Sequence, residues 1–230
     1  MIKKIILLIA LFFSFSIFSS EKIHLDHIDI DLKNQDSLQR GARNVINYCL
    51  NCHSANYMRY NRLQDIGLSE TEIKNNLLFT AEKTGELMNI SMDKVEAKKW
   101  FGANPPNLTV TSRSRGSDWI YTYLRSFYKD NSKIHGWNNL VFPNAAMPHI
   151  LWELQGTQEF TDGHLKLTQA GKLSPQEYDQ FVYDLVNYMT FMGEPAKLVR
   201  TKIGIFVLSF LVLLLVLVIQ LKKEFWKDVK

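Results

Sequence analysis

The sequence predicts a mostly α-helical domain with long loops, followed by a single C-terminal transmembrane helix. Several stretches carry apolar residues at helical spacing behind recognisable capping residues. No stretch alternates apolar and polar residues for long enough to indicate a sizeable sheet. Residues 203–221 contain no charged side chain. A helix of that length, at about 1.5 Å per residue, is close to the hydrocarbon thickness of a bilayer, about 30 Å.

Residues 1–20 have the layout of a secretory signal peptide. Two lysines precede an apolar core, and two serines stand just before Glu21. An uncleaved N-terminal anchor is the alternative interpretation. Cleavage after residue 20 would leave residues 21–199 as an exported domain, which is long enough to form one hydrophobic core.

The first helix of the exported domain is predicted to begin with Asp36 or Ser37 as its cap and to continue to the first cysteine. Its apolar residues fall on one face, at Leu38, Ala42, Val45 and Cys49. The helix therefore places a cysteine on the same stripe that faces the core.

Three further helices are predicted from their starting residues. Ser69 begins a capping box, which indicates a short helix that runs to Leu77. Residues 93–100 indicate another short helix, which Gly102 and two prolines would end. The third helix is expected behind the cap Ser117-Asp118, with a buried face that consists of Ile120, Tyr123, Leu124 and Phe127.

The strongest helix start in the chain is Ser174-Pro175-Gln176-Glu177. Serine caps the helix, proline takes the first helical position, and glutamate completes the capping box. Residues 101–118 and 132–168 are expected to be long irregular loops, apart from a small hairpin at residues 157–167 around Asp162-Gly163.

The uncharged run at residues 203–221 is interpreted as a membrane anchor, because a helix that is apolar on every side needs lipid or a large protein around it. If the signal peptide exports the domain, the tail at residues 222–230 lies in the cytoplasm. The basic residues on the two flanks favour this orientation only slightly. The expected location is the bacterial inner membrane, crossed once, with the domain on the periplasmic side.

The charge of the exported domain argues against nucleic-acid binding. The whole chain has a net charge of +4, but residues 21–199 contain 19 basic and 21 acidic side chains, a net charge of −2. The positive surplus lies in the signal peptide and beside the membrane helix. The domain therefore lacks the basic character that a nucleic-acid interface needs.

Cys49-Leu50-Asn51-Cys52-His53 matches C-x-x-C-H, the attachment signature of a c-type haem. Two thiols must reach the two vinyl groups of one porphyrin, and the adjacent imidazole must lie under the iron. Structural zinc usually needs four protein ligands, often from a second pair of cysteines, and the chain has two cysteines in all. A thioredoxin-like redox motif would need a βαβ pattern, which is missing here. The motif therefore predicts one covalently attached haem c.

His53 would occupy one axial position of the haem iron, and the residues alone leave the other position open. Met147 lies between Pro143 and Pro148 beside small residues, so a stiff loop would present its sulfur to the porphyrin. His149 is its main competitor. An axial methionine gives a comparatively high-potential electron-transfer haem, whereas an open position permits peroxide or gas chemistry. The weaker candidates are Met58, Met88, Met92, Met189, Met192, His24, His27, His135 and His164.

Four stretches of the sequence together resemble cytochrome c1, the haem subunit of the quinol–cytochrome c reductase (cytochrome bc1) complex. Their order and spacing match the family over nearly the whole mature chain. The resemblance implies a cytochrome c-like haem domain with long loops and a C-terminal transmembrane helix. The four stretches are Ser37-Leu38-Gln39-Arg40-Gly41 before the haem motif, Trp100-Phe101-Gly102-Ala103-Asn104-Pro105-Pro106-Asn107-Leu108, Ala145-Ala146-Met147-Pro148, and Gly193-Glu194-Pro195 before the membrane span.

The resemblance implies roles for individual residues. Cys49 and Cys52 would hold the haem covalently, and His53 and Met147 would be the axial ligands of its iron. Pro106 would pack against the porphyrin.

An arginine at the position of Arg113 would pair with a haem propionate, although Arg115 could take that place. The chain also departs from the family. Trp119 stands where members commonly carry tyrosine, and the second cysteine pair of some members is absent. Many members use a strongly acidic surface to dock a basic cytochrome c, whereas a domain with a net charge of −2 provides little general field, although a local patch could remain.

The function that the resemblance implies is electron transfer from the Rieske iron–sulfur protein to a soluble or tethered cytochrome c, with the membrane helix beside cytochrome b. The isolated chain would be an electron-transfer subunit of the oxidoreductase complex and not an enzyme. The alternatives, in decreasing order, are a free-standing membrane-anchored cytochrome c, a haem peroxidase and a zinc-binding module.

Overall fold

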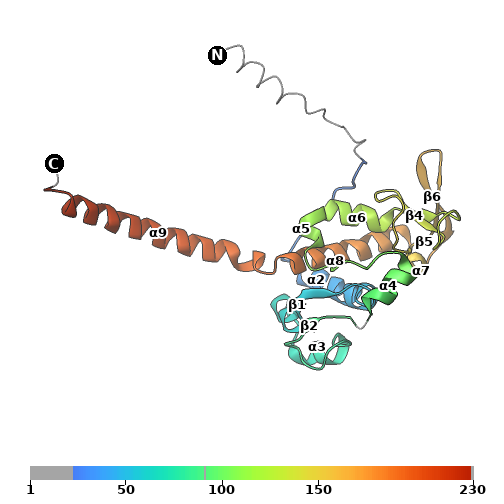
Figure 1. Cartoon of the computed structure of the whole chain (residues 1–230), viewed down its shortest axis with the longest axis horizontal. Coiled ribbons are helices and arrows are strands. Elements are labelled where there is room, and N and C mark those ends of the chain that lie inside the picture. The colour runs from blue at the N-terminus through green and yellow to red at the C-terminus, as the bar shows by residue number, and fades with distance from the viewer. Residues whose placement is uncertain (1–22, 91, 229–230) are drawn as a thin grey trace, which may run out of the picture.

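The computed structural model describes residues 23–90 and 92–228, and Figure 1 shows a body of helices and short strands from which one long helix extends. The predicted signal peptide, residues 1–20, lies outside the described residues. The prediction of a mostly α-helical domain is confirmed. In the described part of the chain, the strands form three separate sheets of two antiparallel strands each.

Helices α2 (Gln35–Asn44) and α8 (Pro175–Gly193) pack closely at the centre of the core. Gly41 permits this approach, because a Cβ atom at that position would lie 2.0 Å from the carbonyl oxygen of Asp184. Beside it, the Arg40 guanidinium donates to the Asp184 carboxylate at 2.6 and 3.1 Å, which compensates the burial of a carboxylate that is 4 % exposed. The glycine and the ion pair together fix α2 against the longest helix of the body.

The cap of α2 is Asn34, and the prediction of Asp36 or Ser37 was wrong. The side-chain oxygen of Asn34 accepts a hydrogen bond from the N–H of Ser37 at 3.0 Å. Ser37 itself is buried, and its hydroxyl accepts from the Asn187 amide of α8 at 3.0 Å. As predicted, the helical path continues to the first cysteine, through a π-helical segment, η1 (Val45–Cys49).

Both predicted capping boxes are present. Ser69 begins α3 (Glu70–Asn76) and Ser174 begins α8. In each box the serine hydroxyl accepts from a glutamate N–H, and the glutamate carboxylate accepts from the serine N–H. The helix expected at residues 93–100 is α4 (Lys94–Phe101), with Asp93 as its cap.

The helix expected behind Ser117 and Asp118 is α6 (Ser117–Arg125). Its cap position is taken by Gly116, which has no side chain to accept a hydrogen bond. The Ser117 hydroxyl lies 3.1 Å from a threonine hydroxyl of α8. The Asp118 carboxylate accepts from the N–H of Ile28 at 3.0 Å. Both side chains that were predicted as caps therefore bind distant segments and do not cap the helix.

The segments predicted as irregular loops contain short regular elements. The predicted hairpin around Asp162-Gly163 is confirmed, and both residues have positive φ, 52° and 80°. Phe127, expected on the buried face of a helix, is buried but lies in a strand beyond the end of α6. The confirmed hairpin consists of β5 (Gly156–Thr161) and β6 (His164–Ala170). The elements that were not predicted are η2 (Tyr60–Ile66, a 3-10 helix), α5 (Thr111–Arg115), α7 (Trp152–Gln155), and the strand pairs β1 (Ala55–Arg59) with β2 (Leu87–Met88) and β3 (Phe127–Lys129) with β4 (Trp137–Asn139).

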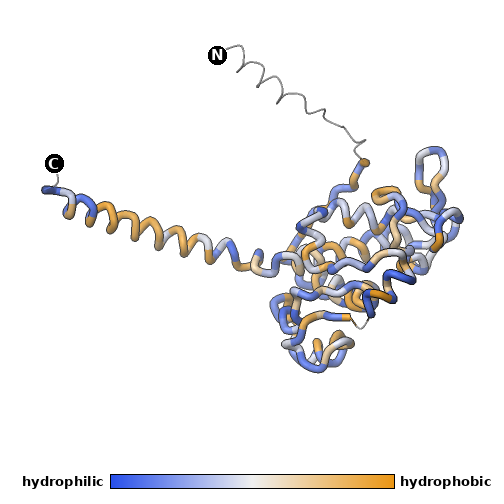
Figure 2. Tube along the Cα trace, viewed as in Figure 1, coloured by the Kyte–Doolittle hydropathy of each residue, from blue (hydrophilic) through white to orange (hydrophobic). Residues whose placement is uncertain are grey.

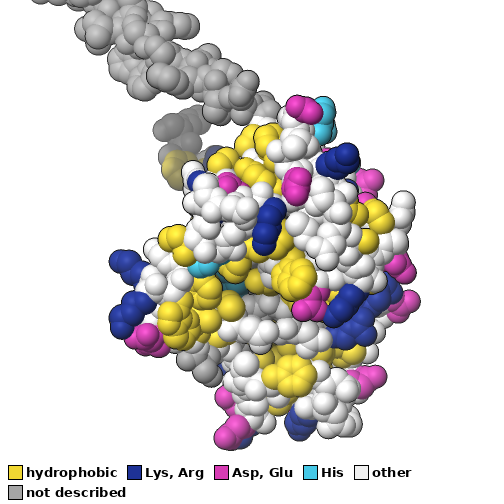
Figure 3. Space-filling model, turned by 90° about the vertical axis from the view of Figure 1, so that its right-hand side faces the viewer, with side chains coloured by type: hydrophobic (Ala, Val, Ile, Leu, Met, Phe, Trp, Pro, Cys, Tyr) yellow, Lys and Arg dark blue, Asp and Glu magenta, His cyan; other side chains and the backbone are white. Residues whose placement is uncertain are grey.

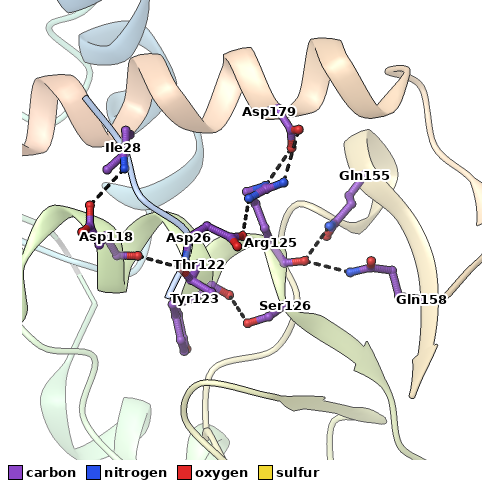
Figure 4. A network of polar contacts seen from close by, with 10 residues as sticks. All are labelled: Asp26, Ile28, Asp118, Thr122, Tyr123, Arg125, Ser126, Gln155, Gln158 and Asp179. Atoms are coloured by element: carbon purple, nitrogen blue, oxygen red, sulfur yellow. Dashed lines mark hydrogen bonds and ion pairs between the residues drawn. The ribbon is translucent and has the colours of Figure 1, made fainter. Parts of the chain in front are cut away.

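A polar network around Arg125 joins four parts of the body (Figure 4). Its guanidinium donates to Asp179 of α8 and to Asp26 of the N-terminal segment at 2.7 and 2.5 Å. Its backbone carbonyl accepts from the amides of Gln155 and Gln158, each at 2.9 Å. The network therefore ties α6 to α8, to the N-terminal segment and to the base of the β5–β6 hairpin.

Helix α9 (Lys197–Phe225) contains the predicted membrane span at residues 203–221. Figure 2 shows the hydrophobic residues that follow one another along the part of α9 that leaves the body. The apolar window of this helix is 0 % buried against the rest of the chain, and its mean hydropathy is 3.0. By length and composition α9 is a candidate membrane-spanning helix.

Candidate haem site

The C-x-x-C-H motif forms a tight turn at the end of the α2 path. The N–H groups of Cys52 and His53 donate to the Cys49 carbonyl at 3.1 and 2.8 Å. Both thiols are free; Cys49 is buried and Cys52 is half-buried. Burial raises the pKa of the Cys49 thiol to about 12. The turn thus presents two adjacent free thiols at the boundary between core and surface, as a doubly attached porphyrin requires.

The imidazole of His53 is oriented by a segment far away in sequence. Its Nδ1 lies 2.8 Å from the carbonyl oxygen of Pro106, so that nitrogen donates and Nε2 keeps its lone pair for a metal. Burial is the main cause that lowers the pKa of His53, which favours the neutral form that ligates iron. Two more hydrogen bonds join the Pro106 segment to the chain that follows the haem motif. The Leu108 N–H donates to the Ser54 carbonyl at 2.9 Å, and the Tyr57 N–H donates to the Thr109 hydroxyl at 3.3 Å.

The resemblance predicted that Pro106 packs against the porphyrin, and that packing stays a prediction. The role of its carbonyl as the acceptor for His53 was not foreseen. The sequence did carry one signal for it, because two consecutive prolines fix an extended backbone that leaves its carbonyls free.

Met147 is half-buried, and the Tyr123 hydroxyl of α6 donates to its sulfur at 3.5 Å. The Tyr123 ring is stacked on Trp119, with ring centroids 4.9 Å apart. Upstream, the Asn138 side chain accepts from the N–H of Asn144 at 2.8 Å, which fixes the loop that carries the methionine. This contact with Tyr123 was missed from the sequence, although Tyr123 was expected on the inner face of its helix.

His149, the competitor of Met147, is packed as a core residue. It is 2 % exposed, its ring is stacked on Phe127 at 4.9 Å, and Trp137 meets it edge-on at 5.0 Å. Burial lowers the pKa of His149 to about 4, so the ring is neutral. Its Nε2 has no hydrogen-bond partner within the described residues. Among the other candidates, Met58, Met88, Met189 and Met192 are buried in the main hydrophobic cluster.

The two arginines considered for a propionate differ in their surroundings. Arg113 is exposed and forms no ion pair with another described residue. The Arg115 guanidinium lies 5.2 Å from the ring centre of Trp119 and 5.9 Å from that of Phe142. Arg113 is therefore free to meet a carboxylate, whereas Arg115 is already engaged with aromatic rings.

The donor set fits haem better than zinc. No group of three or more His, Cys, Asp or Glu side chains comes together within residues 23–90 and 92–228 to hold an ion. A c-type haem needs only two thiols, an oriented imidazole and an apolar setting. On the face in Figure 3, hydrophobic side chains border a hollow beside a histidine.

Comparison with known proteins agrees with this donor set. Residues 29–229 match the model of the cytochrome c1 family. The chain is 51 % identical over 213 residues to a protein of Nitrosomonas europaea named ammonia monooxygenase gamma subunit, covering 92 % of this chain and 91 % of that one. It is 49 % identical over 219 residues to cytochrome c1 of Allochromatium vinosum, covering 90 % of each.

A solved chain of a hyperthermophilic respiratory Complex III is 16 % identical, with a TM-score of 0.43, and the match covers 100 % of this chain and 98 % of that one. The family match, residues 29–229, includes the haem motif and the candidate membrane helix. Members of the family carry one covalently bound haem c, and this chain belongs to the cytochrome c1 family.

Proposed function

We propose that the chain is the haem subunit of a quinol–cytochrome c oxidoreductase (bc1) complex. It takes electrons from a Rieske iron–sulfur protein and passes them to a soluble or tethered cytochrome c. The observation that carries the proposal is the His53–Pro106 hydrogen bond at the C-x-x-C-H turn, found in a chain of the cytochrome c1 family that also carries a candidate membrane helix. Family membership favours the complex over a free-standing carrier.

The residues divide the work of holding the cofactor. Cys49 and Cys52 would bind the porphyrin covalently, and His53 and Met147 would be the two protein ligands of its iron. When bound, the haem supplies a centre that accepts and releases one electron at a time. Two protein ligands would keep small molecules from the iron, whereas the peroxidase alternative needs an accessible iron site.

Three further groups support the site. The Pro106 carbonyl keeps the Nδ1 proton on His53 and thereby its Nε2 free for iron. The Tyr123 hydroxyl holds the Met147 sulfur. We assign Arg113 to a haem propionate because its guanidinium is exposed and forms no ion pair with the described residues.

In this proposal α9 crosses the bacterial inner membrane once, beside cytochrome b, with residues 21–199 on the periplasmic side and residues 222–230 in the cytoplasm. The chain makes and breaks no substrate bonds. Quinol oxidation belongs to the assembled complex, and this subunit passes the electrons on to cytochrome c.

Purification from mildly solubilised membranes tests the assembly. We expect cytochrome b and a Rieske protein to accompany the tagged chain, and quinol to reduce its haem. A chain that carries haem but purifies alone, and that quinol fails to reduce, would contradict the proposal and support a free-standing carrier.

Replacement of the sulfur ligand tests the site. Met147→Leu is expected to lower the haem midpoint potential and to allow carbon monoxide to bind the ferrous iron, because the sixth position opens. Met189→Leu is the matched control, since Met189 lies in the core. If Met147→Leu leaves the reduced spectrum and the potential unchanged, Met147 is not the ligand and His149 must be tested next.

A further inference from the structure

Charge is distributed unevenly over the exported domain. Residues 93–147, which carry Pro106, Tyr123 and Met147, contain eight basic and four acidic side chains, a surplus of four positive charges. The rest of residues 21–199 contains eleven basic and seventeen acidic side chains, a surplus of six negative charges. The segment that forms the proposed walls of the haem site thus has the opposite sign from the remainder of the domain.

Four exposed cations of this segment form no ion pair with another described residue, and we call them the basic rim: Lys94, Lys98, Arg115 and Lys129. The other cations are accounted for elsewhere or less exposed. Arg125 is bound to two aspartates, and Lys99 pairs with Glu96 at 2.7 Å. Arg113 is left out because we assign it to a propionate, and Lys133 because it is half-buried.

The two lysines of α4 lie on the helix that precedes the Pro106 segment in the chain. Lys94 and Lys98 are four residues apart, so they lie on the same face of the helix. The end of α4 is held by Phe101, whose ring lies 5.9 Å from that of His135. The chain then leads directly to Pro106, whose carbonyl accepts from His53.

The other two cations belong to the Met147 side. Arg115 lies over Trp119, which stacks on Tyr123, and the Tyr123 hydroxyl reaches the methionine sulfur. The Lys129 ammonium lies 4.6 Å from the ring centre of Trp137. The positive charges are therefore held by the same aromatic side chains that build the wall of the site.

Each acidic side chain of the segment accepts a hydrogen bond or forms an ion pair within the fold. Asp93 caps α4, and Glu96 pairs with a lysine. Asp118 accepts from the N–H of Ile28, and Asp130 accepts from the Ser132 hydroxyl and from the Asn138 amide of β4. The exposed apolar side chains of the segment include Trp100, Ile134 and Phe142, at 58, 97 and 46 %.

We propose that the basic rim and these three apolar side chains dock an electron acceptor whose own docking face is acidic. The inference rests on the proposed function and specifies the partner. Protein interfaces commonly have an apolar centre surrounded by a polar rim. Complementary charge accelerates the encounter of two proteins, and this acceleration weakens as the salt concentration rises. The sign is the reverse of the acidic surface that resemblance to many family members implied.

Stopped-flow spectroscopy on the purified complex tests the proposal. Its haem is first reduced with quinol and then mixed with one of two soluble cytochromes c of similar size and potential, one acidic and one basic at pH 7. We expect the acidic protein to be reduced faster at low salt, with a rate constant that falls as NaCl is raised. The double variant Lys94→Glu/Lys98→Glu should lower the low-salt rate constant with the acidic protein about tenfold.

Lys33→Glu/Lys83→Glu is the matched control, because it also reverses two charges, on exposed lysines outside the segment. It should change the rate constant with the acidic protein by less than about twofold. Faster reduction of the basic protein, with the same fall in salt, would overturn the inference. So would an equal effect of the control and the double variant. Failure of quinol to reduce the haem at all would instead count against the proposed function, and the two failures are thus distinguishable.

Discussion

Replacement of Gly41 by alanine is expected to destabilise the haem domain through the contact between α2 and α8. The new Cβ atom would lie 2.0 Å from the carbonyl oxygen of Asp184 and 2.7 Å from the Cβ atom of Tyr188. Neither neighbour is the flexible end of a side chain, so relief requires the two helices to separate by about 1 Å. A gap of that size forfeits about a quarter to a half of the dispersion attraction across it.

The magnitude follows from two opposing effects. Overpacking a core costs about 1 to 3 kcal/mol, and more where backbone must move, so about 4 kcal/mol is a reasonable cost here. Alanine in place of glycine within a helix stabilises the helix by about 1 kcal/mol. The net loss is then about 3 kcal/mol, which for a domain of this size lowers the melting temperature by about 6 to 12 °C.

The assay is thermal unfolding of the detergent-solubilised protein, followed by circular dichroism in the haem absorption band. Gly85→Ala is the control, because a Cβ atom there meets nothing within 4 Å and the backbone has no positive φ. Its melting temperature should stay within about 2 °C of the wild type, which corresponds to about 0.5 kcal/mol. If Gly41→Ala is as stable as this control, the close approach of the two helices is not a feature of the folded protein.

The remaining predictions concern the proposed sulfur ligand, a buried hydroxyl and the proposed membrane anchor. Tyr123→Phe removes the donor to the Met147 sulfur and should lower the midpoint potential by about 30 to 60 mV while methionine stays bound, where 59 mV is a tenfold change in the ratio of reduced to oxidised haem; an unchanged redox titration would refute this. Tyr178→Phe leaves the buried carbonyl of Leu124 without its 2.8 Å hydrogen-bond donor and should lower the free energy of unfolding by about 1 kcal/mol. A denaturant titration measures this, and an unchanged midpoint would contradict the prediction. A stop codon after Val199 should release a periplasmic haem domain with an unchanged spectrum, and a product still found with the membrane would show that α9 is not the sole anchor.

Local sequence signals predicted helix starts well where the capping side chains had no competing partner. Ser69 and Ser174 lie on the surface, and both formed the expected boxes. Ser37 and Asp118 were also good capping residues, but each was recruited by a group more than 80 positions away along the chain. Such partners exist only once the chain has folded, so no local pattern could reveal the loss of these caps.

The same limit applies to the site. The attachment motif is contiguous, so Cys49, Cys52 and His53 could be proposed from spacing alone. The hydrogen bond from His53 to Pro106 joins residues 53 positions apart, and the contact from Tyr123 to Met147 joins residues 24 positions apart. Proline stiffness and an inward-facing tyrosine were visible in the sequence, but the atoms that they would meet were not.

The connection between α8 and α9 constrains how partners reach the haem. The link is short, and the N–H of Lys197 donates to the Glu194 carbonyl at 3.0 Å, while the Glu194 carboxylate also pairs with Arg200. At the end of α8, a Cβ atom on Gly193 would lie 2.6 Å from the Ser112 hydroxyl, so α5 also packs closely against this point. Because α8 is the helix that holds α2, the membrane helix is coupled to the cysteines through packed elements and not through a flexible tether. If α9 spans the membrane, the height of the haem above it is therefore set by the fold, and an electron donor or acceptor has to come to the haem at that height.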